Sequence, residues 1–591
     1  MSESLSSTEL VRQALAMLTT GRAREAVGLL EPVVVAGGAD AACVGVLGMA
    51  LELAGRRDEA IARTREAIAL SAALGHTDPA LLTNLGAMLS AKGEHADAID
   101  LLTRARAIAP GSLEAVVGLA SALRAAGRYA DALGAIRPAM TSGPGGQPLR
   151  DPRILMTAAD LLWDVGRTDQ AAPLLAAAVR LAPAEPRLAT LAANLHNYLP
   201  TSAADSLAAH RRAAALVAGS VAAHVPARRP VTRPLRVGLL SADLREHSCA
   251  YFLQPLLDHI DPERAQVFAY FTLAKYDGFS ERLGAKCAAF RRVHGKSPAE
   301  LAAIIRADQL DVLVETDGLS PNHSLAAVAL RPVPRTVTWL GYPNTTGLAA
   351  VDARIVDSTT DPDGSEAACS ERLVRLNRCF VCYQPPAGAP NVAPLPATAT
   401  GSVTFGCFNT LFKFTRLALT TYAAVLRAVP GSNLLIKNKP CGDPGVARDL
   451  AMRFKECGID PARIRCEGWK PVRDEHLAAY NRVDIALDSM PYCGTTTTCE
   501  ALFMGVPVVT LRGAMHAGRV GASLLKAVGE DDLVCGNAEE FAAIAARLAG
   551  DIPRLATRRA GLRQRLLASE LCDGPSFARA FVDTLEEVAW G

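Results

Sequence analysis

A short motif recurs five times in the first third of the chain and constrains the fold more than any other feature. Each copy begins with Gly and places an Ala five residues later. The copies are Gly21–Ala26, Gly55–Ala60, Gly93–Ala98, Gly127–Ala132 and Gly166–Ala171, with their glycines 34, 38, 34 and 39 residues apart. Because Gly permits a tight turn and Ala permits close packing, each unit is expected to be a helical hairpin. Neighbouring hairpins then bury each other's apolar faces in a stack.

The 34-residue interval is that of the tetratricopeptide repeat, so the array resembles this repeat family. A stack of such hairpins has a concave surface, and we predict that it recruits a protein partner. Asn84, on the first helix of a hairpin, is a candidate to contact the partner's backbone. The alternative is a stack that serves only to form a homo-oligomer. We expect the array over residues 1–185 and a helical linker over 186–234, which ends in a polar stretch with three prolines.

The pattern changes at Leu235, where short apolar runs begin to alternate with helical stretches. This alternation predicts parallel sheets with helices on both faces. It breaks at the Pro- and Ala-rich stretch Pro385–Pro396 and then resumes, so we expect two doubly wound α/β domains over 235–395 and 396–591. Ligands should bind at the carboxyl ends of their strands. Strands are expected at Arg236–Ser241, Val267–Thr272, Leu310–Glu315, Thr336–Leu340, Val403–Phe408, Asn433–Lys437, Ile464–Glu467, Ile485–Asp488 and Val508–Leu511.

Composition agrees with about three folded domains in a chain of 591 residues. Half of the residues are hydrophobic, which argues against disorder, and a net charge of +2 gives no electrostatic case for binding nucleic acid. The 14 cysteines are scattered, and Cys379 and Cys382 lack the second pair that a zinc site needs, so we expect free thiols. No signal peptide or long apolar run is visible, and we expect a cytoplasmic protein without a membrane span.

The segment Leu487–Glu500 is the most informative about chemistry, because a strand leads there through a small-residue turn into a helix. Gly494 lets a ligand approach the backbone closely. The run Thr495–Thr498 opens the helix, where free N–H groups and the helix dipole favour a phosphate. Glu500 follows within reach of a ribose. Four consecutive threonines exceed what capping needs, so we predict a diphosphate site rather than a redundantly capped helix.

Two other residues follow predicted strands and could face the same cleft. Lys413 comes shortly after Val403–Phe408 and could neutralise a leaving phosphate as a point charge; otherwise it is a surface lysine. His247 follows the first strand of the α/β region, where an imidazole suits acid/base work or substrate contact. A structural role for His247 is the alternative.

These residues belong to a series of motifs whose order and spacing resemble the nucleocytoplasmic protein O-glycosyltransferases, the family of protein O-GlcNAc transferase and plant SPINDLY. The resemblance covers residues 235–591, and repeats before this module are also the family's arrangement. The motifs are Arg236-Val-Gly, His247-Ser, Leu330-Arg-Pro, Trp339–Gly347, Thr404–Asn409, Thr495–Glu500 and Met504–Pro507.

The resemblance implies a glycosyltransferase B fold of two Rossmann-like domains, in which Lys413 stabilises a leaving diphosphate and His247 faces sugar and acceptor. No metal or cofactor is expected besides the nucleotide-sugar substrate. The final helix, Ser576–Trp590, should cross back to the first domain. The implied donor-binding residues are Asn409, Arg473, His476, Thr495, Thr496, Thr497 and Glu500. On the acceptor or sugar side the implied residues are Tyr342, Pro343, Thr345 and Thr346.

Several motifs are more similar to SPINDLY, which uses GDP-fucose, than to the GlcNAc enzyme. Thr495 stands where the animal GlcNAc enzyme has a His, and Leu319 stands where many relatives have a His. The donor therefore stays open among UDP-GlcNAc, GDP-fucose and a CMP-linked nonulosonic acid.

The sequence thus predicts a bacterial, inverting, metal-independent protein O-glycosyltransferase. Its repeats would recruit an acceptor protein, with flagellin as a candidate, and could also mediate homo-oligomerisation. One alternative is the same fold acting on an acceptor that is not a protein. Another is a repeat adaptor with a catalytically weak transferase domain.

Overall fold

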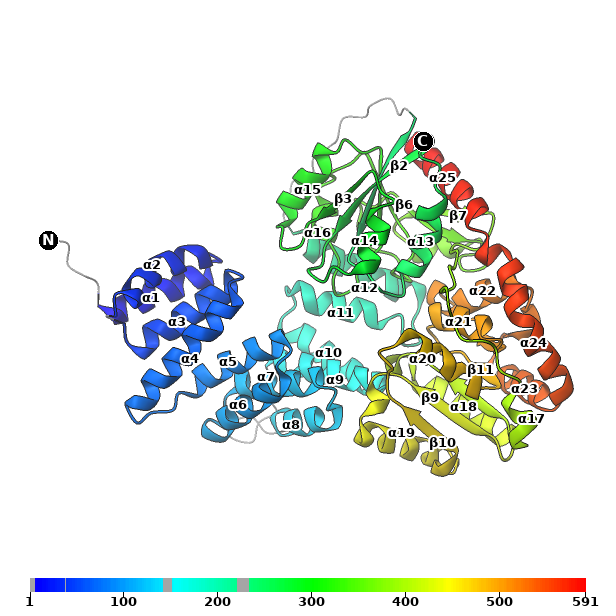
Figure 1. The fold of residues 1–591 in the computed structure, drawn as a ribbon, viewed down its shortest axis with the longest axis horizontal. Helices are drawn as coiled ribbons and strands as arrows, with labels where there is room; N and C mark the ends of the chain where they lie inside the picture. The colour runs from blue at the N-terminus through cyan, green and yellow to red at the C-terminus, as the bar shows by residue number, and fades with distance from the viewer. Residues whose placement is uncertain (1–5, 38, 142–150, 220–232, 591) are drawn as a thin grey trace. The chain divides into compact units, whose positions relative to one another are not determined.

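The computed structural model describes residues 6–37, 39–141, 151–219 and 233–590. The chain divides into two compact units, Met1–Leu162 and Trp163–Gly591 (Figure 1). Most of the proline-containing stretch expected before residue 235 lies outside the described residues.

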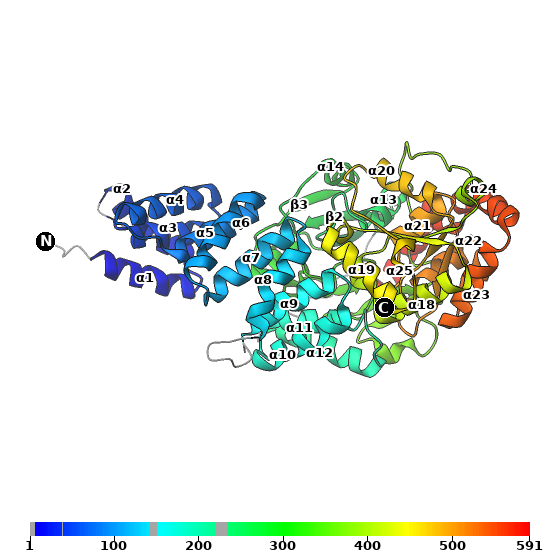
Figure 2. The same ribbon diagram turned by 90° about the horizontal axis from the view of Figure 1, so that it is seen from below.

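The first unit consists of stacked helical hairpins, as the repeats predict. In Figure 2 α2, α4 and α6 form one row and α3 and α5 form the next. The glycine at each hairpin turn has a positive φ, for example +94° at Gly93, which favours glycine there. The helices are α1 (Ser7–Thr19), α2 (Ala23–Val35), α3 (Ala41–Leu53), α4 (Arg57–Ala73), α5 (Pro79–Lys92), α6 (His95–Ile108), α7 (Leu113–Ala125), α8 (Tyr129–Thr141) and α9 (Pro152–Asp164). Asn84 lies half-buried on α5.

The second unit begins in the last turn of α9, so the division between compact units falls before the expected array end at residue 185. The fifth hairpin turn packs directly on the α/β region. A Cβ on Gly166 would lie 2.7 Å from the carbonyl oxygen of Leu411, and Thr168 Oγ1 donates to the carbonyl of Phe412 at 3.0 Å. The helices that precede the sheets in this unit are α10 (Thr168–Leu181), α11 (Pro186–Leu195) and α12 (Ala203–Ala218).

The first α/β domain, which we call the N-lobe, is a parallel sheet in the order β3-β2-β1-β4-β5-β6-β7. Its four expected strands are confirmed. Its strands are β1 (Leu235–Ser241), β2 (Ala265–Phe271), β3 (Ala289–Arg292), β4 (Val312–Glu315), β5 (Arg335–Thr338), β6 (Ala353–Asp357) and β7 (Arg372–Leu376). The helices are α13 (Ala250–His259), α14 (Gly278–Gly284), α15 (Pro298–Ala307) and α16 (Leu325–Ala329).

Three strands of the N-lobe, β3, β6 and β7, are absent from the sequence-based expectation. The strands β3 and β7 lie at the two edges of the sheet, carry arginines and are only partly buried. The strand β6 is buried, but Arg354 and Asp357 interrupt its apolar character. An apolar run is therefore a poor guide to these strands.

The second α/β domain, the C-lobe, is a parallel sheet in the order β10-β9-β8-β11-β12-β13. Its five expected strands are confirmed, and the two-residue β13 is additional. The strands are β8 (Thr404–Cys407), β9 (Asn433–Lys437), β10 (Ile464–Glu467), β11 (Ile485–Leu487), β12 (Val508–Leu511) and β13 (Val534–Cys535). The helices are α17 (Pro396–Thr400), α18 (Arg416–Ala428), α19 (Pro444–Glu456), α20 (Arg473–Ala478), α21 (Thr496–Phe503), α22 (Val520–Val528), α23 (Ala538–Ala549) and α24 (Ile552–Ala568).

The last helix, α25 (Gly574–Trp590), crosses back to the N-lobe, which confirms the expectation for the C-terminus. In Figure 1 it runs beside β7 and ends near β2. Phe577 and Phe581 pack on Trp339 at the end of β5, with ring centroids 6.0 and 4.5 Å away. The helix therefore ties the two lobes together.

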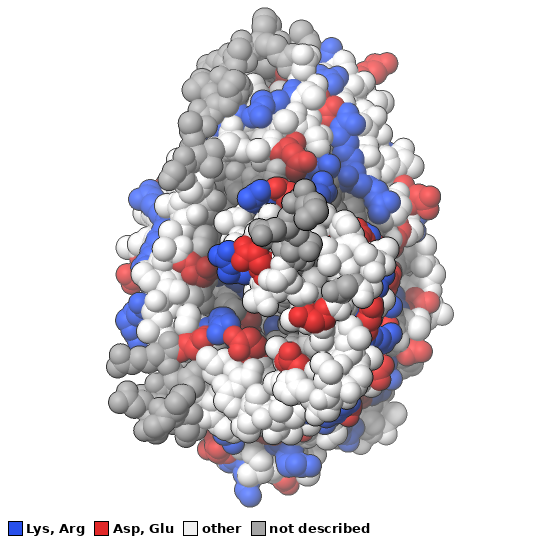
Figure 3. Space-filling model, turned by 90° about the vertical axis from the view of Figure 1, so that its left-hand side faces the viewer, with Lys and Arg blue, Asp and Glu red and all other residues white. Residues whose placement is uncertain are grey.

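The distribution of surface charge and the state of the cysteines agree with the expectations from composition. The face in Figure 3 shows both positive and negative side chains with broad uncharged areas between them. All 14 cysteines are free thiols, and Cys379 and Cys382 are buried. Within the described residues no helix combines the length and apolarity needed to cross a bilayer.

Candidate active site

A turn and the start of α21 form the centre of the site at the carboxyl end of β11. The buried carboxylate of Asp488 accepts from the backbone N–H of Gly494 at 2.6 Å and from Thr510 Oγ1 at 2.7 Å. Gly494 has no room for a side chain, since a Cβ would lie 2.4 Å from Thr497 Oγ1. Thr495 makes no side-chain cap, so the first N–H groups of α21 remain available to an anion.

Thr497 is tied to the neighbouring strand end. Its hydroxyl donates to Asn409 Oδ1 at 2.9 Å, and the Asn409 amide lies 3.4 Å from Asp488. The structure thus brings Asn409 and the threonine run together at the ends of β8 and β11. Thr496 begins α21 and is half-buried.

Lys413 lies in the same place, where its side chain is half-buried rather than open to solvent. It lies on the short 3₁₀ helix η3 (Leu411–Lys413). Its Nζ donates to the carbonyl of Cys493 at 2.7 Å and lies 3.6 Å from the ring centroid of Tyr492. Burial lowers the pKa of Lys413 to about 8, although the Asp488 carboxylate opposes this shift. Within the described residues no carboxylate forms an ion pair with it, so its charge is available to a ligand.

Glu500 belongs to a buried chain of polar side chains. Its Oε2 lies 3.0 Å from His476 Nε2, and His476 Nδ1 lies 2.6 Å from Nζ of Lys437. Lys437 ends β9 and is 2% exposed, and burial lowers its pKa to about 8 against the attraction of Glu500. A protonated lysine can only donate, so Nδ1 accepts and the Nε2 hydrogen points to Glu500. The three side chains therefore orient one another.

Arg473 lies at the start of α20 and faces the N-lobe. Its guanidinium carbon is 3.7 Å from the ring centroid of Tyr251 on α13, a cation–π distance. Its Nε and Nη2 are buried, and neither has a hydrogen-bond partner within the described residues. These two donors suit an acceptor on a ligand held between the lobes.

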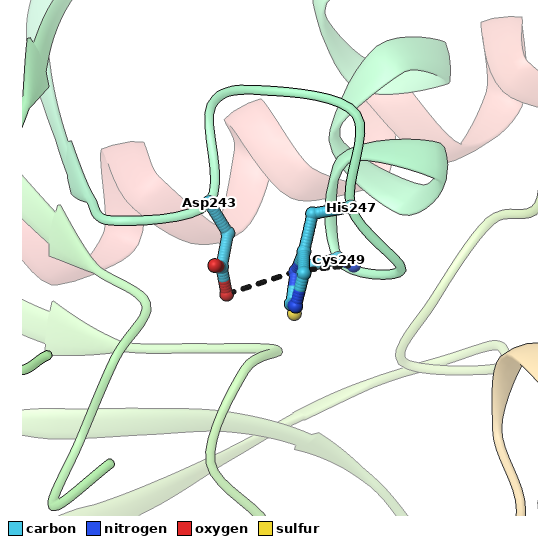
Figure 4. A group of neighbouring side chains, drawn as sticks. All are labelled: Asp243, His247 and Cys249. Atoms are coloured by element: carbon cyan, nitrogen blue, oxygen red, sulfur yellow. Dashed lines mark hydrogen bonds and ion pairs between the residues drawn. The ribbon is translucent and has the colours of Figure 1, made fainter. Parts of the chain in front are cut away.

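His247 belongs to the N-lobe and lies on the loop after β1. Figure 4 shows Asp243 and His247 pointing toward each other, with the Cys249 sulfur beside the imidazole. His247 Nδ1 is 3.1 Å from Asp243 Oδ2. Burial raises the pKa of Asp243, but the hydrogen bond and charge of His247 outweigh it and leave that pKa below its ordinary value. The carboxylate thus fixes the ring orientation.

Asp243, His247 and Cys249 also form a set of donors that could hold a metal ion. Their nearest ligand atoms lie within 4.8 Å of one another. The direct contact between Asp243 Oδ2 and His247 Nδ1 gives the carboxylate a partner and orients the ring, so the set has an explanation without an ion.

The loop after β5 carries the residues implied on the acceptor side, and their side chains bond to the scaffold. The Tyr342 hydroxyl lies 2.9 Å from Nε2 of His210 on α12. Thr345 Oγ1 donates to Glu371 at 2.6 Å, and Thr346 N–H and hydroxyl donate to the same carboxylate. Because these side chains are engaged, the backbone of this loop and Pro343 are the parts that remain for contact with a sugar. Leu319 is fully buried in the N-lobe core.

Four residues of this site are absent from the sequence-based prediction: Lys437, Asp488, Asp243 and Tyr492. Lys437 and Asp488 each stand at the end of an expected strand, which is a usable signal at the carboxyl edge of a parallel sheet. Asp243 lies four residues before His247, but nothing local shows that they meet. Tyr492 gains its role only through the placement of Lys413 over its ring.

The fold defines a two-lobed α/β protein preceded by helical repeats, and comparison with known proteins agrees. The model of glycosyltransferase family 41 matches residues 216–384 and 394–581. A tetratricopeptide repeat model matches residues 89–149. The chain therefore belongs to glycosyltransferase family 41.

Relatives of known name cover the same region. A protein from Solanum lycopersicum named as the probable peptide N-acetylglucosaminyltransferase SPINDLY is 42% identical over 352 residues, 59% of this chain and 38% of that protein. The protein named SEC from Arabidopsis thaliana is 27% identical over 59% of this chain and 37% of its own length. The chain thus spans less than two fifths of the length of these relatives.

A solved structure extends the likeness to the repeats. A mutant O-GlcNAc transferase from Thermobaculum terrenum is 30% identical and superposes with a TM-score of 0.78. The match covers 87% of this chain and 99% of that one. The fold is accordingly tetratricopeptide helices followed by a glycosyltransferase B fold.

Proposed function

We propose that this protein transfers a sugar from a nucleotide-sugar donor to Ser or Thr hydroxyls of an acceptor protein recruited by the repeats. The observation that carries the proposal is Lys413, a half-buried ammonium beside the open N-terminus of α21 that forms no ion pair with any described carboxylate. This arrangement suits a leaving diphosphate. Family membership and the SPINDLY and O-GlcNAc transferase relatives support the same reaction class.

In the proposed reaction the acceptor hydroxyl oxygen attacks the anomeric carbon while the bond from that carbon to the diphosphate oxygen breaks. Attack from the face opposite the leaving group inverts the anomeric centre. Negative charge grows on the diphosphate, where Lys413 and the N–H groups of α21 would stabilise it. These groups supply the charge that a metal supplies elsewhere, so the proposal requires no metal ion.

The nucleoside would lie over the carboxyl end of β9 and the start of α20. Glu500 and His476 would bind the ribose side, and Arg473 would bind from the edge nearest the N-lobe. The hydroxyl proton of the acceptor would leave toward the N-lobe, where His247 stands with its orienting Asp243. His247 acts there as the general base or positions the reacting groups, and most of the rate gain comes from orientation.

The donor and acceptor are proposed only by class. UDP-GlcNAc, GDP-fucose and CMP-linked nonulosonic acids are the donors to compare, and flagellin is the candidate acceptor. Thermal-shift measurements with each donor test the first choice, because a bound ligand stabilises the folded protein. The donor that is used should raise the melting temperature more than the others.

The decisive test is Lys413→Ala in the full chain. We expect transfer to fall by at least about 10³-fold, since the variant loses the cation at the leaving group. Binding of the acceptor protein by the repeats should be unchanged. Near-normal turnover in Lys413→Ala would refute the assignment, and so would loss of acceptor binding together with transfer.

A further inference from the structure

A cavity of about 260 Å³ lies where three parts of the second unit meet. Its walls come from Ala203 at the start of α12, from the N-lobe segment 361–369 after β6, and from the C-lobe segment 514–519 after β12. None of the proposed donor-binding residues lines it. Its polar wall consists of Asn344, Arg354, Asp361, Asp363, Ser365, Cys369, His516 and Arg519.

Arg354 is the unusual member of this wall. It lies on β6, is 3% exposed and lines the cavity. Its guanidinium makes a weak contact of 3.8 Å to the Cys369 sulfur. Within the described residues no carboxylate lies within 4 Å of it. A buried cation is normally paired, so this charge calls for a counterion.

Two carboxylates, Asp361 and Glu371, act electrostatically on Arg354, but both are hydrogen-bonded to other groups. Asp361 Oδ2 contacts Nδ1 of the buried His516 at 2.5 Å. Glu371 accepts from Thr345 at 2.6 Å and from the Thr346 backbone at 2.6 Å. Neither side chain can turn to Arg354 without leaving a buried polar group unpaired.

Arg519 adds a second cation to the cavity wall. Its Nε donates to the carbonyl of Gly513 at 3.1 Å, and its Nη1 donates to the carbonyl of Thr360 and to the Ser365 hydroxyl, both at 3.3 Å. Those contacts leave Nη2 without a protein partner within the described residues. Two carboxylates also line the cavity: Asp363 is exposed at its rim, and Asp361 is buried and engaged by His516.

We propose that this cavity binds a small anion through Arg354 and Arg519, with a phosphate or a carboxylate as the group that is recognised. The planar guanidinium of Arg354 matches either group with two parallel N–H donors. The Ser365 hydroxyl, which accepts from Arg519, can donate its own hydrogen to the anion. Because both lobes and α12 contribute walls, the bound anion also stabilises their mutual arrangement. The proposal does not depend on the transferase reaction.

The test uses the full chain carrying Lys413→Ala, so that phosphate does not bind at the proposed diphosphate site. Inorganic phosphate and malonate are titrated by calorimetry at constant ionic strength, and the tighter of the two identifies the recognised group. Replacing Arg354 by Met should weaken binding by about tenfold or more, since a hydrogen bond between charged groups is lost. Arg354→Lys should retain part of the affinity.

Two further variants keep the test decisive if Arg354→Met does not fold. Arg519→Gln should weaken binding several-fold, and Asp363→Asn should tighten it about two-fold, because it removes a partly screened negative charge. Arg372→Met changes an exposed arginine on β7 that does not line the cavity, and it should leave binding unchanged. Anion binding that is absent in the Lys413→Ala chain, or equal in all of these variants, overturns the proposal.

Discussion

At the scale of single residues, the site contains two lysines, the half-buried Lys413 and the buried Lys437, for which the described part of the chain offers no ion-pair partner. Lys413 and Lys437 each bond to a neutral acceptor, a carbonyl and an imidazole. Burial without a counter-charge lowers the pKa of both to about 8. Such an environment lowers the stability of the folded protein. A ligand that carries negative charge would compensate the two lysines, so this arrangement is typical of a binding site.

The lowered pKa of Lys413 predicts a pH dependence. As pH rises through about 8, the free enzyme loses the proton that makes Lys413 a cation, so kcat/KM for the donor should fall. A bound diphosphate raises the lysine pKa, so kcat should fall only at higher pH. Initial rates between pH 6 and pH 10 test this. The fall should persist in Lys437→Met, which removes the other lysine that titrates there; a flat profile would contradict the role of Lys413.

Lys437 should act on donor binding through His476 and Glu500. Replacing it by Met removes the donor to His476 Nδ1, so the ring can turn away from Glu500. We expect KM for the donor to rise about tenfold with a smaller change in kcat, because the variant loses one charge-assisted hydrogen bond. Lys437→Arg should restore part of the affinity. Steady-state kinetics of both variants measure KM and kcat. An unchanged KM in Lys437→Met would exclude this positioning role.

At the scale of elements, the segment that carries Lys413 packs against a repeat turn. The element η3 carries Lys413 and is packed beneath the turn of the fifth hairpin, where Phe412 meets the rings of Trp163 and Tyr198. Tyr198 in turn packs on Tyr492, the residue under the Lys413 ammonium. The last repeat is therefore part of the support of the active site.

Gly166→Ala tests this support. The new Cβ would meet the Leu411 carbonyl at 2.7 Å and sit at a φ of +73°, so η3 must shift. We expect a loss of about 1–2 kcal/mol in the free energy of unfolding and a fall in kcat of tenfold or more, because small displacements of catalytic groups are costly.

The matched control for that variant is Gly127→Ala. Gly127 is the turn of the preceding hairpin, with a φ of +77° and nothing within 4 Å of a new Cβ. It should show a similar backbone penalty with unchanged kcat. Equal kinetics in both variants would mean that the contact with Leu411 does not matter for catalysis.

At the scale of the whole catalytic unit, the two lobes are joined by contacts far apart in sequence. Asp361 of the N-lobe meets His516 of the C-lobe, and Ser523 of the C-lobe donates to Asp357 of the N-lobe at 2.6 Å. The helix α25 adds an apolar contact through Phe581 and Trp339. These links hold the two lobes in a fixed arrangement.

Phe581→Ala should therefore weaken the unit as a whole. Phe581 is 1% exposed, and its loss leaves a cavity against Trp339, so we expect a cost of about 3–5 kcal/mol in the free energy of unfolding. Denaturant unfolding followed by tryptophan fluorescence measures it. Leu567→Ala, at a residue that is 44% exposed, should stay within about 0.5 kcal/mol. A similar, small effect of both changes would show that α25 does not brace the lobes.

The sequence by itself determined the features whose signals are local. The repeat period predicts the hairpins, and alternating apolar runs predict both sheets. The turn at Gly494 and the threonine run predict an anion site, because a helix N-terminus carries its own donors. Lys413 was placed near this site by its position after a strand, since the ends of parallel strands share one edge.

Only the tertiary structure decided which side chains meet. The chain of Lys437, His476 and Glu500 joins three elements, and the lone guanidinium of Arg354 is visible only once its neighbours are known to be engaged elsewhere. The packing of the Gly166 turn on Leu411 joins residues 245 positions apart. The physical reason is that burial and pairing depend on long-range packing, which local periodicity does not encode.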